Sequence, residues 1–199
     1  MRTQPPGAMR SGTASLTDTE IDLYARQIIV PGVGAGGQLR LLSSPVYFPG
    51  SRADAKLGRR YAAAAGMPLV EDAHAATLVI VSLHDDEALE TVIRYLETSA
   101  DSSKNSSAPQ IPIVLYSAEH PPWPRIVREL DELQAARRTR TPTSTLPQAQ
   151  HNAGACAAAG TAMALVLGWQ APGIPEVHDS DTDTPPGSSR SSMPTRADG

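Results

Sequence analysis

Apolar residues along this chain follow two spacings that alternate. Continuous runs rich in β-branched residues occur at 77–83 (TLVIVSL) and 111–116 (IPIVLY), and such runs are typical of strands buried on both faces of a parallel sheet. Apolar residues at helical spacing follow the two runs, at 87–98 and 125–138. Alternating strands and helices predict an α/β fold with a mainly parallel sheet.

The segment 17–66 predicts a helix, a second short helix, a strand, a turn and a third helix, in that order. Thr17 and Glu20 have the spacing of a capping box, in which two side chains satisfy free backbone N–H groups at a helix start. Pro31-Gly32 ends the first helix. The later elements are a strand at 46–48, a turn at Gly50, and an alanine-rich helix at 53–65 with Gly66 as its C-cap. A strand, a glycine turn and a helix in this order open a nucleotide-binding α/β unit.

The remaining segments complete one domain with extended ends. We expect a strand at 67–72, a polar low-complexity loop at 99–110, a linker at 141–150 and a helix of small residues at 151–169 with Gly168 as its C-cap. The final residues are rich in Pro, Ser, Asp and Thr, a composition that argues for disorder. The sequence therefore predicts a disordered N-terminus over 1–16, one α/β domain over 17–169 and a disordered tail over 170–199.

Composition and charge narrow the classes of partner. A net charge of −4 offers no electrostatic basis for binding nucleic acid. The single cysteine excludes a disulfide framework and a multi-cysteine zinc site, and it suits a reducing compartment. The first twelve residues lack the apolar core of a signal peptide, and the apolar run at 153–167 is short for a membrane span. We expect a cytoplasmic protein that binds neither nucleic acid nor membrane.

Short motifs within 17–66 carry a family resemblance. They are Tyr24-Ala25-Arg26-Gln27 in the first helix, Gly37-Gln38 in the second, Gly50 after the strand and Ala65-Gly66 at the end of the third helix. In these residues the chain resembles, without a gap, the ThiF/MoeB family of ubiquitin-activating-type adenylyltransferases. The helix of small residues at 151–169 resembles a late helix of that family. The resemblance implies a reduced Rossmann-like three-layer domain with an N-terminal helical extension.

The resemblance also implies cofactors and partners. Family members use ATP and Mg²⁺, and the arginine matching Arg26 reaches the nucleotide phosphates of the neighbouring subunit. A guanidinium suits that contact because it is permanently charged and binds oxyanions bidentately. The alternative is that Arg26 is a surface residue that pairs locally. The implied partners are a second copy, an intact ThiF-like protein or a small ubiquitin-like carrier protein.

Several departures from the family pattern fall on the segments that bind the nucleotide or carry out catalysis in the family. The family loop has the form Gly-x-Gly-Gly-x-Gly, which lets backbone N–H groups approach a phosphate, whereas this chain has Gly50-Ser51-Arg52-Ala53-Asp54-Ala55. The family segment that carries phosphate-binding lysine is missing between Asp72 and Thr77. Cys156 lies in the late helix, away from the family's catalytic cysteine loop, and we expect it to be buried and inert. These departures argue against ATP binding, catalysis and a zinc site.

Three acidic residues and one histidine are further candidates. Glu71 or Asp72, near the end of the predicted strand at 67–72, matches the position of an acid that holds ribose hydroxyls, although a solvated loop acid is the interpretation we favour. Asp85 lies near the position of the family's Mg²⁺ ligand. The alternative is that Asp85 is the N-cap of the following helix, a role that needs no metal, and we favour this interpretation. His120 is expected to be an exposed loop residue.

The sequence therefore predicts a degenerate ThiF/MoeB-like protein that acts as a non-catalytic subunit or scaffold. Two alternatives remain open. One is an active ATP-dependent adenylyltransferase acting on the C-terminus of a small carrier protein. The other is a Rossmann-like module that binds a nucleotide without catalysis.

Overall fold

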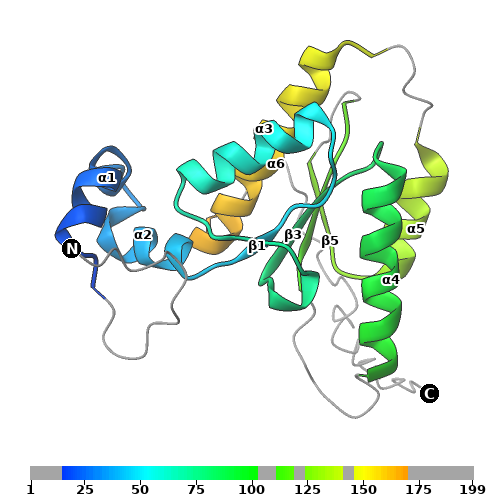
Figure 1. Cartoon of the computed structure of the whole chain (residues 1–199), viewed down its shortest axis with the longest axis horizontal. Coiled ribbons are helices and arrows are strands. Elements are labelled where there is room, and N and C mark those ends of the chain that lie inside the picture. Colours follow the sequence, from blue (N-terminus) through cyan, green and yellow to red (C-terminus); the bar gives the residue numbers. More distant parts are fainter. Residues whose placement is uncertain (1–14, 103–110, 119–123, 141–145, 170–199) are drawn as a thin grey trace, which may run out of the picture.

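A five-stranded sheet in the order β2-β1-β3-β4-β5 forms the centre of the computed structural model (Figure 1). The structure describes residues 15–102, 111–118, 124–140 and 146–169. The strands are β1 (Val46–Tyr47), β2 (Leu69–Val70), β3 (Leu78–Ser82), β4 (Ile113–Tyr116) and β5 (Arg125–Val127). The first four strands are mutually parallel, and β5 runs antiparallel to β4. The predicted α/β fold with a mainly parallel sheet is confirmed.

Two layers of helices enclose this sheet. The helices are α1 (Asp18–Ile28), α2 (Gly34–Leu42), α3 (Ala53–Ala64), the 3₁₀ turn η1 (Ala73–Ala75), α4 (Asp86–Ser102), α5 (Leu130–Thr139) and α6 (Gln148–Leu167). Successive residues of β3 serve opposite layers, because side chains alternate along a strand. Leu78 and Ile80 pack with α2, α3 and α6, whereas Val79 and Val81 pack with α4 and α5. The molecule is thus a Rossmann-like three-layer domain, as predicted.

Helices α1 and α2 form the predicted N-terminal extension, which projects from one end of the domain (Figure 1). The capping box is present, since the Thr17 hydroxyl accepts a hydrogen bond from the backbone N–H of Glu20 while the Glu20 side chain accepts one from the N–H of Thr17. Helix α1 contains no buried residue, and its closest partner among the described elements is α2. The Gln27 side chain ties α1 to the domain by donating to the carbonyl of Ala64.

Helix α6 packs closely under the sheet because its side chains are small. A Cβ on Gly154 would lie 2.5 Å from the carbonyl oxygen of Ser117, which follows β4. Ala155 and Ala158 are fully buried against α3 and the sheet. This packing brings the N-termini of α3 and α6 to the carboxyl ends of β3 and β4. The helix ends as predicted, with Gly168 in the left-handed conformation at φ 73°.

The predicted helix at 125–138 is wrong at its start. Residues 125–127 form β5, which pairs Val127 with Ile113 and Ile126 with Val114, and α5 begins only at Leu130. The β-branched residues Ile126 and Val127 suit a strand, and β4 offers its free edge to them. Two loop boundaries also shift, since α4 extends through Ser102 and α6 begins at Gln148.

Other predictions fall on residues that the structure does not describe. Residues 1–14 and 170–199, which belong to the predicted disordered ends, and His120 lie outside the described residues. Within the described part of the chain, the apolar length of every helix falls short of what a membrane crossing requires.

Candidate functional site

The order of the strands points to the carboxyl ends of β1 and β3. The chain moves from β1 to β2 on one side and then returns to β3 on the other side of β1, so the direction of the crossovers reverses between β1 and β3. Open parallel sheets bind ligands in the crevice outside such a reversal. Gly50 follows β1 at this point with φ +104°, a conformation that favours glycine.

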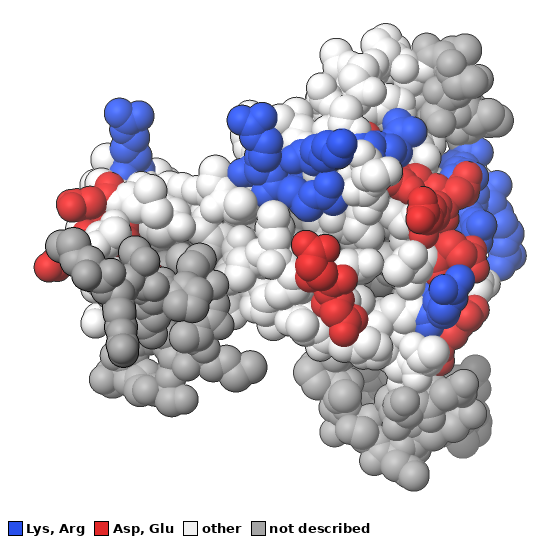
Figure 2. Space-filling view, viewed as in Figure 1, with Lys and Arg blue, Asp and Glu red and all other residues white. Residues whose placement is uncertain are grey.

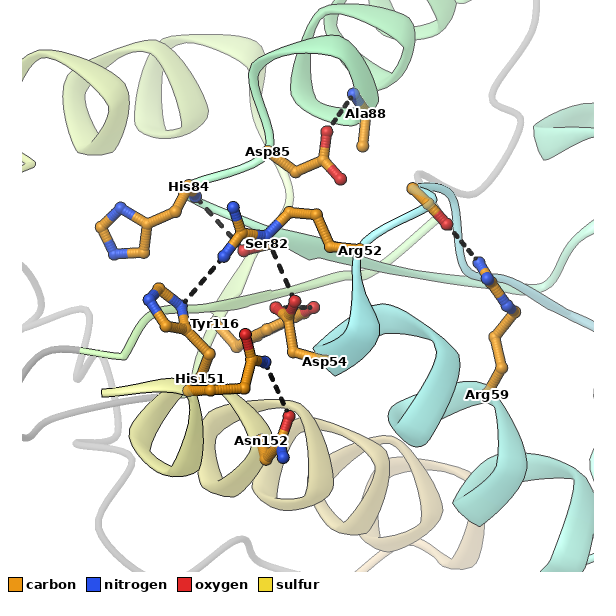
Figure 3. A network of polar contacts seen from close by, with 12 residues as sticks. Arg52, Asp54, Arg59, Ser82, His84, Asp85, Ala88, Tyr116, His151 and Asn152 are labelled. Carbon is orange, nitrogen blue, oxygen red and sulfur yellow. Dashed lines mark hydrogen bonds and ion pairs between the residues drawn. The ribbon is translucent and has the colours of Figure 1, made fainter. Parts of the chain in front are cut away.

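A buried polar cluster lies at the first turn of α3 (Figure 3). Asp54, the second residue of α3, has 0% of its surface exposed. Its Oδ2 accepts a hydrogen bond of 3.1 Å from the hydroxyl of Tyr116, and its Oδ1 lies 3.2 Å from Nε of Arg52. Burial is the main cause that raises the pKa of Tyr116, and the negative charge of Asp54 adds to it. The hydroxyl of Tyr116 therefore stays protonated and serves as a hydrogen-bond donor.

Two histidines extend this cluster toward α6. His151 is 4% exposed, and its Nδ1 lies 3.5 Å from Nη2 of Arg52. Burial is the main cause that lowers the pKa of His151, and the positive charge of Arg52 adds to it. The negative charge of Asp54 opposes this shift. The ring of His84 meets the ring of His151 edge to face at 5.7 Å, and His84 Nε2 shares a hydrogen bond of 2.7 Å with Ser117 Oγ. The cluster thus joins α3, α6 and the ends of β3 and β4.

Asp85 connects the end of β3 with the glycine turn. Its Oδ1 accepts a hydrogen bond of 3.1 Å from the backbone N–H of Ala88, so the side chain caps α4 as expected. A Cβ on Gly50 would lie 2.5 Å from Asp85 Oδ2, so a larger residue at this turn would force the Asp85 side chain to move. Among the described residues, no group of three His, Cys, Asp or Glu side chains is arranged to hold a metal ion.

An open crevice of about 540 Å³ lies beside this turn, between α3, the end of β2 and the start of α4. Its charged lining comes from Lys56 and Arg59 of α3, Glu71 after β2 and Glu87 of α4. The guanidinium of Arg59 is held at the wall because its Nη1 donates to the carbonyls of Phe48 (2.8 Å) and Gly50 (2.7 Å).

The structure brings most of the predicted site residues together. Gly50 and Glu71 line the same crevice, and Asp85 lies against Gly50. Asp72 caps η1 by accepting from the N–H of His74, and it lines an adjoining cavity of about 320 Å³ with Glu71. Arg26 is exposed on α1 and lines neither cavity.

Several residues of the site were missed by sequence reasoning. An acid in the first turn of a helix is ordinary, so Asp54 carried no sign that it would be buried. His151 was treated only as the start of a predicted helix. Tyr116, at the end of a predicted buried strand, was the one detectable member, because the carboxyl ends of parallel strands line ligand sites. Cys156, expected to be buried, is partly exposed.

Comparison with known proteins adds no family assignment. No protein-family model matches the chain, and a search of curated proteins gives no match. The resemblance to the ThiF/MoeB family remains a prediction from the motifs within 17–66 and the helix of small residues at 151–169.

Proposed function

We propose that this chain is a non-catalytic subunit or scaffold of the ThiF/MoeB type, which binds a protein partner and does not activate a substrate with ATP. The observation that carries the proposal is the position of Asp54. In a nucleotide-binding α/β unit the phosphates meet the first turn of the helix after β1, where free backbone N–H groups and the helix dipole attract anions. In this chain that turn carries its own buried carboxylate.

The charges around the first turn of α3 support the proposal. Asp54 lies within the turn, and the carboxylate of Asp85 lies against the adjacent Gly50. Both carboxylates repel a phosphate at this position. Arg52, the N-cap residue of α3, already pairs with Asp54 at 3.2 Å. To bind here, a nucleotide would have to break the ion pair between Arg52 and Asp54. It would also have to bring its negatively charged phosphate out of water and next to a carboxylate, and removing such a charge from water costs free energy.

The exposed apolar surface of α1 supports a role in partner binding. Leu23 of α1 is 70% exposed, and Ile29 at its C-cap is 80% exposed. An eleven-residue helix draws most of its stability from packing. We propose that α1 docks on a second copy or on an intact ThiF-like protein, and that Arg26 contacts the nucleotide of that partner. A small ubiquitin-like carrier protein is then a client of the assembly. The single cysteine supports a cytoplasmic location, where thiols stay reduced.

Isothermal titration calorimetry with ATP and Mg²⁺ tests the first half of the proposal. We expect no saturable heat up to millimolar ATP, with Arg26→Ala indistinguishable from the wild type. Saturable binding at micromolar ATP overturns the proposal and supports the active adenylyltransferase instead.

Light scattering after size-exclusion chromatography tests the second half. We expect the wild type to form a dimer, alone or with an intact ThiF-like protein, and Leu23→Asp to abolish it. Tyr61→Asp is the matched control, because Tyr61 is also exposed but lies on α3. A monomer under both conditions, or equal loss in both variants, contradicts docking through α1.

A further inference from the structure

Four charged residues, two basic and two acidic, line the crevice beside Gly50. Lys56 and Arg59 lie three residues apart on α3 and so share a face of that helix. Glu71 and Glu87 approach from the end of β2 and the first turn of α4. We call these four residues the charged crevice. Figure 2 shows the basic surface over α3 next to acidic surface.

The charges of this crevice do not neutralise one another. Within the described part of the chain, Lys56, Glu71 and Glu87 form no ion pair, and Arg59 bonds only to backbone carbonyls. Those carbonyl bonds use Nη1 of Arg59, so the guanidinium is held in place while its other nitrogens make no hydrogen bond with described residues. A fixed guanidinium with a free edge is suited to bind a carboxylate bidentately.

The opposite wall has the electrostatic properties of a cation site. Tyr47, the last residue of β1, also lines the crevice. Burial is the main cause that raises the pKa of Tyr47, and the negative charges of Asp72 and Glu71 add to it. The carboxylates of Glu71 and Glu87, which have no cationic partner among the described residues, line the space, and both can accept hydrogen bonds from an ammonium group.

Apolar residues also line the crevice. Leu69 of β2 is 39% exposed and lines the crevice together with Val70. The volume of about 540 Å³ is within the range of clefts that hold small molecules. A cleft lined by apolar, cationic and anionic residues favours a ligand that has an apolar side group and one charge of each sign.

We propose that the charged crevice binds a zwitterionic small molecule with apolar side groups, such as a short peptide. Its carboxylate contacts Arg59 and Lys56, its ammonium group contacts Glu71 and Glu87, and its side groups cover Leu69. This inference goes beyond the proposed function and does not depend on it. A nucleotide fits the crevice less well, because its phosphates would lie near the carboxylates of Asp54 and Asp85.

Calorimetry with the dipeptide leucyl-leucine tests this inference on the full chain. We expect saturable binding at neutral pH, and we expect N-acetyl-leucyl-leucine and leucyl-leucine amide, which each lack one charge, to bind at least about tenfold more weakly. Lys56→Met and Glu71→Gln should weaken the dipeptide by a similar factor. The matched controls are Arg60→Met and Glu97→Gln, which remove exposed charges from α3 and α4 outside the crevice.

Two results would overturn the inference. One is no saturable binding of the dipeptide, whether or not AMP binds, and the other is binding of the two neutralised analogues that equals binding of the dipeptide. Circular dichroism of each variant confirms that it is folded. Failure of the dipeptide leaves the proposed non-catalytic role intact, whereas binding of ATP with Mg²⁺ overturns that role and is measured separately.

Discussion

The hydroxyl of Tyr116 donates a hydrogen bond of 3.1 Å to Oδ2 of Asp54, and both side chains are buried. This contact joins the end of β4 to the first turn of α3, across 62 residues of sequence. It places a neutral donor against a buried carboxylate whose other side-chain partner, among the described residues, is Arg52. Both carboxylate oxygens of Asp54 therefore have a side-chain partner within the protein.

Removing the Tyr116 hydroxyl should destabilise the fold. Tyr116→Phe keeps the ring but leaves Oδ2 of Asp54 buried without its donor, and such an unsatisfied acceptor costs about 1–3 kcal/mol. Urea denaturation measures the free energy of unfolding. Tyr61→Phe serves as the control, because Tyr61 is exposed and its hydroxyl makes no hydrogen bond among the described residues. Equal effects of the two substitutions would contradict this account.

The stability of the protein should fall as the pH falls through the titration of His151. A histidine in an unfolded chain has a pKa of about 6.5. Its folded pKa is lowered, so the unfolded chain binds more protons below that pH and protonation favours unfolding. We expect His151→Gln to flatten the pH dependence of the free energy of unfolding between about pH 7.5 and 5. Gln150→Ala, at the same end of α6, should retain the wild-type slope, and a wild-type slope in His151→Gln would argue against this role.

Asp85 should act as a helix cap. Asp85→Ala removes the acceptor for the N–H of Ala88 and should cost about 0.5–2 kcal/mol, whereas Asp85→Ser keeps a capping oxygen and should lose less. Chemical denaturation of the two variants measures the difference.

The same samples test Mg²⁺ binding at Asp85. If Asp85 were a metal ligand, Mg²⁺ would raise the melting temperature of the wild type and not that of Asp85→Ala. We expect Mg²⁺ to leave both melting temperatures unchanged.

Two glycines of α6 should respond oppositely to alanine. Gly154→Ala places a methyl group 2.5 Å from the Ser117 carbonyl oxygen, so the backbone must shift, and overpacking of this kind costs about 1–3 kcal/mol. A Cβ added to Gly160 would meet no atom of the described residues within 4 Å, and Gly160→Ala should stabilise the helix by about 0.5–1 kcal/mol. Thermal unfolding of the pair measures both effects. Destabilisation by Gly160→Ala would show that α6 has a further close neighbour there.

The predictions made from local pattern were the more successful ones. The β-branched run at 77–83 contains β3, and the Thr17 capping box and the Gly168 C-cap form where the sequence predicts them. Each of these depends on residues within a few positions of one another. The start of the predicted helix at 125–138 failed because β5 forms by pairing with β4, a contact that local spacing does not report.

The sequence by itself determined the fold class and the order of most elements. A parallel sheet puts the ends of its strands on one edge, and Gly50, Glu71 and Asp85 therefore come together wherever the strands are correctly recognised. Only the tertiary structure decided what occupies that edge. Arg52 and His151 meet across 99 residues because α3 packs closely on α6, and Asp54 turns inward because Tyr116 lies beneath it. Such contacts depend on packing between distant elements, and no periodicity in the chain encodes them.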